Sequence, residues 1–176
     1  MLEGVADGTK PVLVPQFTLK DGAVLMPLAF IEDATVDVRG STTTVTYRQS
    51  QMDRLGKAVP VGDNRLAVTT TYTLEPNRLS RTDVFVPKQP LDIAMIRMEF
   101  AGFSTNARTS DTTTVFANGA VTSFQVHGLD TCQARALDRD HDYESDGGAM
   151  TSLVVCSSGS FTAKEPLTIT WSILYR

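Results

Sequence analysis

The sequence predicts an all-β protein, an antiparallel β-sandwich of roughly ten strands, with a barrel as the second choice. Apolar and polar residues alternate with a period of two along most of the chain, which is typical of strands with one buried and one wet face. Turn signals separate these segments, and no stretch of ten or more residues keeps the 3.6-residue period of a helix. Many short strands joined by local turns favour antiparallel pairing over a parallel α/β sheet.

The clearest strands are LAVTTTYTL at residues 66–74 and LTITWSILY at residues 167–175. In each of them, large apolar side chains take most of the alternate positions, and threonine, serine or alanine take most of the others. Threonine suits a strand because its branched Cβ fits a pleated surface. Trp171 belongs to the apolar series, so we expect it in the core and not on an aromatic platform for sugar rings.

The connections between the predicted strands contain residues that suit tight turns. Asp21-Gly22 and Asn118-Gly119 are strong hairpin signals, because these residue types tolerate positive φ. Three further turns are expected at residues 40–41, 75–78 and 157–159, which contain glycine or proline.

The length of 176 residues fits one domain, and we expect residues 1–176 to form a single β-sandwich. The first residues show no charged segment followed by an apolar one, so they do not resemble a signal peptide. The chain ends directly after a strand-like run. Both ends lead us to expect a domain excised from a longer protein.

Charge and hydropathy argue against two classes of function. The formal net charge is −4 and the basic residues are scattered, whereas nucleic-acid binding needs a concentrated field of lysine and arginine. No apolar run approaches the ~20 residues that a membrane span needs. We therefore expect neither a nucleic-acid partner nor a membrane span.

The two cysteines, Cys132 and Cys156, are too few for a disulfide scaffold. They fit either one bridge in an exported protein, which would add about 3 kcal/mol of stability, or two buried thiols in a cytosolic one. The sequence leaves both possibilities open. Zinc is not expected, because there is no C-x-x-C motif and only His127 and His141 could supply imidazole ligands.

The segment LDRDHDYESDGG, residues 137–148, places acids on alternate positions before two glycines. Asp142, Glu144 and Asp146 have the spacing that opens an EF-hand calcium loop. The twelfth position holds Leu153 instead of glutamate, and no helices flank the run, so an EF-hand is excluded. Two interpretations stay open, a solvated loop and a site formed by these three carboxylates for calcium, which is the one cofactor that the sequence suggests.

Arg81, Asp83 and His127 are the candidates for substrate binding. Arg81 and Asp83 project together from one face of a strand, where they could contact a sugar hydroxyl or carboxylate, or form an ion pair on an open sheet face. His127 ends a strand, on its wet face or beside the following loop. His127 or His141 could act as a general base, but no nucleophile–base pair follows from the spacing, so no catalytic residue is assigned.

The stretch LAVTTTYTLEPNRLSRTDVFVPKQPLDIAMIRMEFAGF, residues 66–103, leads from a strand rich in Thr, Val and Tyr through a short turn to a strand with Arg-Thr-Asp. A proline-bounded loop and an apolar strand follow. This order resembles the β-sandwich domains attached to polysaccharide lyases, especially heparinase II/III-like enzymes, and to some glycoside hydrolases. The resemblance implies an accessory domain that packs against a helical catalytic domain and helps to shape a polysaccharide cleft. It transfers no catalytic residue to this chain.

The leading hypothesis is a non-catalytic accessory β-sandwich domain of a carbohydrate-processing protein. Its expected partners are the catalytic domain of the same parent chain and a polysaccharide. The alternative is a calcium-dependent carbohydrate-binding or adhesive module, and a third hypothesis is a stand-alone sandwich enzyme that uses His127 or His141. A periplasmic or extracellular location is favoured, and the chain is not expected to be catalytic on its own.

Overall fold

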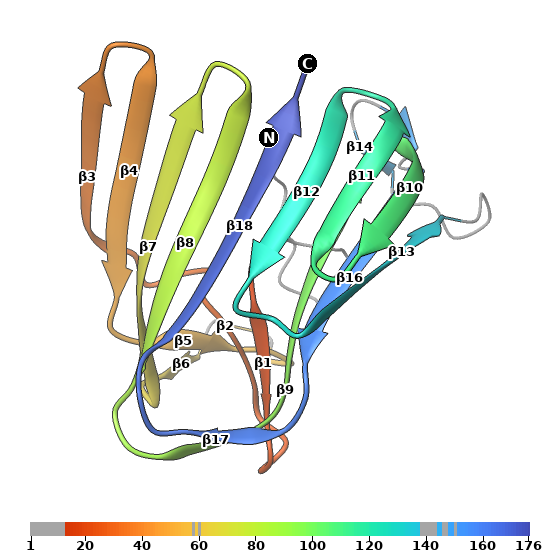
Figure 1. The fold of residues 1–176 in the computed structure, drawn as a ribbon. Helices are drawn as coiled ribbons and strands as arrows, with labels where there is room; N and C mark the ends of the chain where they lie inside the picture. Colours follow the sequence, from red (N-terminus) through yellow and green to blue (C-terminus); the bar gives the residue numbers. More distant parts are fainter. Residues whose placement is uncertain (1–12, 58, 60, 138–143, 146–147, 150) are drawn as a thin grey trace.

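The computed structural model describes residues 13–176, except residues 58, 60, 138–143, 146–147 and 150. Within this part of the chain, every strand pairing is antiparallel and the strands form two large, separate sheets instead of one closed barrel (Figure 1). The predicted β-sandwich is confirmed. The segments number β1 to β18, more than the roughly ten expected, because several strands are only two or three residues long.

The first sheet contains strands from both halves of the chain. In spatial order its strands are β13 (Thr131–Ala136), β16 (Ser152–Ser158), β9 (Leu91–Gly102), β1 (Gln16–Leu19), β2 (Val24–Met26), β5 (Met52–Arg54) and β6 (Gly62–Asp63), and β17 (Phe161–Ala163) also pairs with β9.

The second sheet is a broad layer of mostly longer strands. Its order is β10 (Thr105–Ser110), β11 (Thr113–Asn118), β12 (Val121–His127), β18 (Leu167–Tyr175), β8 (Arg78–Pro87), β7 (Leu66–Glu75), β4 (Thr42–Gln49) and β3 (Glu32–Arg39). A small separate hairpin joins β14 (Glu144–Ser145) to β15 (Gly148–Ala149).

The core lies between the two sheets and is rich in aromatic side chains. Phe17 of the first sheet packs edge-on against Phe85 of the second, with ring centroids 4.6 Å apart. Trp171 is fully buried, as its apolar series predicts, and its Nε1 donates a hydrogen bond to the Leu13 carbonyl at 3.0 Å. The apolar side chains on alternate positions of β18 therefore point into the core, as predicted.

The turns fall where their residues predict them. Gly22, Gly40 and Gly119 all have positive φ, and each sits in a turn between two strands. A side chain at position 119 would also collide with Ser104, because a Cβ there would lie 2.5 Å from the Ser104 Cα. The hairpin signals in the sequence thus reflect a backbone conformation that glycine adopts without strain.

The second sheet extends beyond the first at its β3 edge. Figure 1 shows the β3–β4 and β7–β8 hairpins projecting past the short strands β1, β2 and β5. In one row across the sheet, Val36 pairs with Val45, which pairs with Tyr72. In the next row, Val38 pairs with Thr43, which pairs with Leu74. Val36, Val38 and Leu74 therefore share the inner face of the sheet, yet their exposed fractions are 65%, 65% and 47%.

Cys132 and Cys156 form a disulfide between directly paired positions of β13 and β16. This resolves the two possibilities that the sequence left open in favour of the bridge. Among the described residues there is no helix with the length and apolar character that a bilayer crossing requires.

Candidate functional site

Arg81 and Asp83 form an ion pair in the interior. Nε of Arg81 donates hydrogen bonds to both carboxylate oxygens of Asp83, at 3.0 and 2.8 Å. The side chains are only 1% and 0% exposed. An ion pair on an open sheet face was therefore the wrong interpretation: both residues share their face of β8 with Phe85, which lies in the core.

Two neighbours on β7 complete this network. Nη1 of Arg81 donates to the Tyr72 hydroxyl at 2.7 Å, and the guanidinium also lies over the Tyr72 ring, 5.1 Å from its centroid. Thr70 donates its hydroxyl proton to Asp83 at 2.6 Å. The pair is thus embedded in hydrogen bonds, which a buried ion pair needs to offset the cost of desolvation.

The electrostatics of this network keep Arg81 charged. Burial acts to lower the pKa of Arg81, but the Asp83 carboxylate and Tyr72 outweigh it, so the pKa lies above its ordinary value. Burial also raises the pKa of Tyr72, although the adjacent Arg81 opposes that change. Nη2 of Arg81 has no hydrogen-bond partner among the described residues. Arg81 and Asp83 are inaccessible to solvent, so the structure gives the network a structural role in joining β7 and β8.

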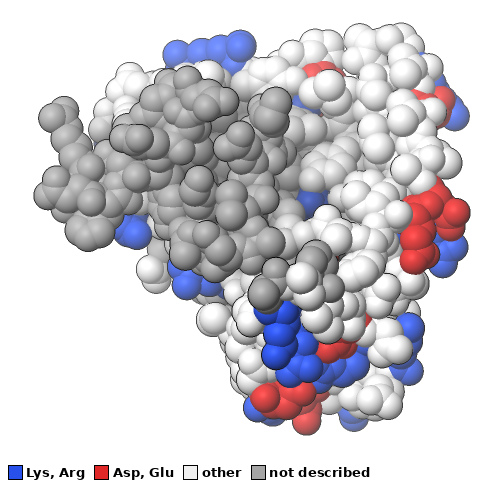
Figure 2. Space-filling view, turned by 180° about the vertical axis from the view of Figure 1, so that it is seen from behind, with Lys and Arg blue, Asp and Glu red and all other residues white. Residues whose placement is uncertain are grey.

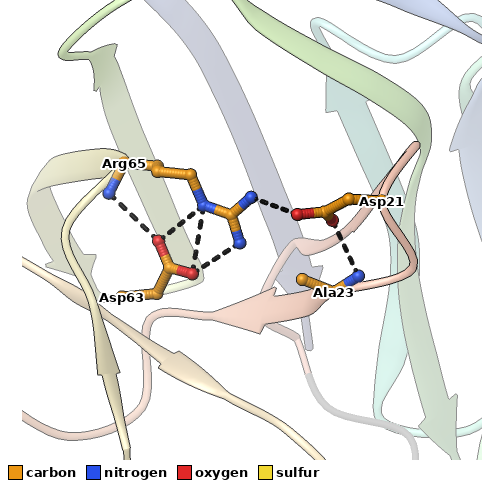
Figure 3. A network of polar contacts seen from close by, with 4 residues as sticks. All are labelled: Asp21, Ala23, Asp63 and Arg65. Atoms are coloured by element: carbon orange, nitrogen blue, oxygen red, sulfur yellow. Dashed lines mark hydrogen bonds and ion pairs between the residues drawn. The ribbon is translucent and has the colours of Figure 1, made fainter.

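A second polar network lies at the surface, where the β1–β2 turn meets the β6–β7 connection (Figure 3). Nε and Nη2 of Arg65 both donate to Asp63, with Nη2 at 2.6 Å from Oδ2. Nη1 of Arg65 reaches across to Asp21, also at 2.6 Å. The backbone N–H of Ala23 donates to the other Asp21 oxygen at 2.9 Å. One guanidinium thus joins two turns that are distant in the sequence.

The pKa values in this network move in the directions that favour the charged forms. The hydrogen bond from Arg65 lowers the pKa of Asp63, against a smaller opposing effect of burial. The Ala23 backbone hydrogen bond and then Arg65 lower the pKa of Asp21. The hydrogen bond to Asp63 raises the pKa of Arg65. All three groups remain ionised at neutral pH.

The network forms one wall of an open polar cleft of about 470 Å³. The cleft is lined by Asp21, Gln51, Arg54, Gly62, Asp63, Asn64 and Arg65. Sequence reasoning missed this site, because its residues come from three connections and two short strands with no recognisable motif. The sequence indicates Asp21 only as a turn residue. The available signal was the Asp63–Arg65 spacing, which places both side chains on the same side of an extended chain.

The remaining predicted site residues lie elsewhere. His127 is exposed at the end of β12, on the wet side of the sheet as expected, beside Thr170 of β18. Asp142, Asp146 and His141 lie outside the described residues, and Glu144 is described only as a backbone position in β14. Within the described residues, no group of three or more His, Cys, Asp or Glu side chains could hold a metal ion.

Comparison with known proteins gives structural neighbours only. No family model matches the chain, and no curated protein matches it. The heparan sulfate lyase HepC from Pedobacter heparinus aligns with a TM-score of 0.50 and 6% identity, covering 82% of this chain and 22% of that one. A structure of heparinase III gives 0.48 and 12%, covering 82% and 21%. The 4-alpha-glucanotransferase from Thermococcus litoralis gives 0.46 and 8%, covering 95% and 28%.

At these identities the likeness shows the fold alone. The HepC alignment confirms, at the level of fold, the partial resemblance to a lyase β-domain that residues 66–103 suggested. The chain spans only 22% of the length of that lyase.

Proposed function

We propose that the chain is a non-catalytic accessory β-sandwich domain of a carbohydrate-processing protein, and that it packs against a catalytic domain of the same parent chain. The exposed apolar side chains on the inner face of the second sheet are the observation that carries this proposal. An isolated sandwich normally covers that face, because exposed valine and leucine there forgo the hydrophobic stabilisation that drives packing.

The position of these residues supports docking by a large partner. Val36 and Val38 lie on β3 and Leu74 lies on β7, and the half-buried Val45 of the intervening strand β4 and Tyr72 of β7 lie beside them. The lyases whose fold this chain resembles are more than four times its aligned length, so in those proteins most of the molecule lies outside the corresponding domain. A catalytic partner domain that covers the inner face of β3, β4 and β7 would fit both findings.

Hydrogen exchange tests this proposal. We would measure amide exchange of the 176-residue chain alone and of the full-length natural protein. We expect added protection in β3, β4 and β7, and unchanged exchange in β10 and β11 at the opposite edge of the same sheet. Equal exchange of β3, β4 and β7 in the two samples would contradict the proposal.

A variant gives a matched control. Val38→Lys places a charge on the docking face, whereas Thr44→Lys places it on the outer face of the neighbouring strand. In the full-length protein, we expect Val38→Lys, but not Thr44→Lys, to remove the added protection of β3, β4 and β7, because a buried lysine is costly at an apolar interface. Equal effects of the two variants would argue against docking on the inner face.

A further inference from the structure

We propose that the cleft lined by Asp21, Gln51, Arg54, Asn64 and Arg65 binds a neutral sugar unit of a polysaccharide. This takes carbohydrate as the ligand class from the proposed function, but the cleft is separate from the docking face. It lies at the β1–β2 turn and the segment between the end of β4 and the start of β7, whereas the docking face belongs to β3, β4 and β7 near the β7–β8 turn. Binding and docking can therefore be tested independently.

The first argument is the pairing of donors with acceptors. A sugar hydroxyl both donates and accepts a hydrogen bond, so a site for adjacent hydroxyls needs both kinds of group side by side. The cleft is lined by the guanidinium of Arg54 and the amides of Gln51 and Asn64. Each carboxylate oxygen of Asp21 accepts one hydrogen bond in the described structure, and each can accept a second.

The second argument is preorganisation. Arg65 uses three of its five N–H groups to hold Asp63 and Asp21, with Nε shared between the two Asp63 oxygens, and two N–H groups remain. Asp21 is therefore fixed in place before a ligand arrives. Fixed polar groups bind more tightly than mobile ones, because less conformational freedom is lost on binding. Figure 3 shows Arg65 between the two carboxylates, with Asp21 held by Arg65 on one side and by the Ala23 backbone on the other.

The third argument concerns charge. The lining contains two arginines and two aspartates, so its formal charges cancel. The position of Arg54 is consistent with this balance, because its charge lowers the pKa of both Asp21 and Asp63. A cleft without net charge gains little from an anionic ligand, and Asp21 would repel one. This favours a neutral sugar over a uronate or sulfated one. The volume of about 470 Å³ lies within the range of small-molecule sites, about 300–1,000 Å³.

Gly62 also supports the proposed sugar site, because it leaves room for the side chain of Gln51. A Cβ there would collide with the side-chain amide of Gln51, so Gln51 can lie against this strand only because position 62 has no side chain. The collision involves the end of a flexible side chain and no backbone atom. Gly62→Ala should therefore displace Gln51 while leaving the fold intact.

The test is a ¹⁵N NMR titration of the 176-residue chain, followed through the side-chain amide signals of Gln51 and Asn64. The neutral probes are maltohexaose, cellohexaose and mannohexaose, and the acidic probe is an alginate hexasaccharide. We expect at least one neutral probe to shift both signals in a saturable way, at low-millimolar concentration or below. Asn64→Ala should weaken that binding about fivefold through the loss of a hydrogen bond. Gly62→Ala should also weaken it, whereas Gln133→Ala on the exposed face of β13 should not.

Three results would overturn the inference. They are the absence of saturable shifts with every neutral probe, equal affinity in Asn64→Ala and the unaltered chain, and tighter binding of the acidic probe. The backbone amide spectrum of each variant reports whether it is folded. None of these results bears on exchange in β3, β4 and β7, so failure of the cleft and failure of the docking proposal remain distinguishable.

Discussion

Two arginine–aspartate pairs in this molecule have the same spacing and opposite surroundings. Arg81 and Asp83 are two residues apart on β8, and Asp63 at the end of β6 and Arg65 just before β7 are also two residues apart. In the first pair both side chains are almost completely buried. In the second pair Arg65 is 24% exposed and Asp63 is 10% exposed, and Arg65 also reaches Asp21, which is 54% exposed.

The difference follows from what lies on the opposite side of each pair. Asp83 sits between Thr70 and Ile169 in the middle of the broad sheet, where the first sheet covers it. Asp63 lies in the two-residue strand β6 at the edge of the first sheet, open to the cleft. Identical residue types thus form a dry structural pair in one place and a solvated wall of a cleft in the other. Position in the sheet decides between the two roles.

The largest expected effect comes from breaking the buried pair. Asp83→Ala leaves the Arg81 charge without its partner in the interior, and we expect the free energy of unfolding to fall by about 3–5 kcal/mol. Urea denaturation followed by fluorescence of Trp171 would measure it. A loss below about 1 kcal/mol would show that Arg81 finds water or another partner.

A double replacement provides the control for that experiment. Arg81→Met with Asp83→Leu removes both charges together and keeps apolar volume at both positions. Since no isolated charge remains, this variant should be more stable than Asp83→Ala. A double variant that is less stable than Asp83→Ala would mean that the pair contributes more than it costs to bury.

The pair at the cleft should be weaker and more sensitive to salt. Asp63→Ala should lower the free energy of unfolding by about 1 kcal/mol, because solvent screens a network at the surface. The loss should shrink at about 1 M NaCl, where the Debye length is near 3 Å. Asp83→Ala should keep most of its effect at the same salt concentration. Equal salt dependence of the two variants would contradict this contrast in burial.

The smallest expected effect is a dependence on pH. The pKa values of Asp21 and Asp63 are lowered in the folded protein, so their contribution to stability is fully present above the unfolded pKa, near 4. It is lost as the pH falls through the lower folded values. Between about pH 4 and pH 2 the unaltered chain should therefore lose more stability than Asp63→Asn, as measured by urea denaturation at each pH. Parallel curves of unfolding free energy against pH for the two proteins would show that the Asp63 carboxylate does not contribute in this way.

Much of the fold could be predicted because its signals are local. The period-two alternation and the turns at Gly22, Gly40 and Gly119 depend only on neighbouring residues. The short strands β5 and β6 could not be found in this way, since they have only three and two residues, and β5 is defined by its pairing with the distant strand β2. The projection of β3 and β4 beyond the first sheet could not be predicted either, because it depends on how the two sheets pack against each other.

The candidate site was less predictable for the same reason. Alternation correctly placed Arg81 and Asp83 on one face of a strand, but in a strand rich in threonine and serine it did not show which face was buried. The cleft joins position 21 to positions 51–54 and 62–65, and no local pattern relates them. Sequence spacing found the pair that proved structural and missed the one that lines an accessible surface.

The disulfide has a consequence for the covalent integrity of the chain. Cys132 and Cys156 are 24 positions apart, and each lies in a strand of the first sheet. A protease that cuts any peptide bond between them produces two fragments that stay joined through sulfur. Such a nicked molecule migrates as one species on a denaturing gel without reductant and as two species with it. Reductant therefore determines whether cleavage in this interval separates the end of β16, β17 and the central strand β18 from the rest of the protein.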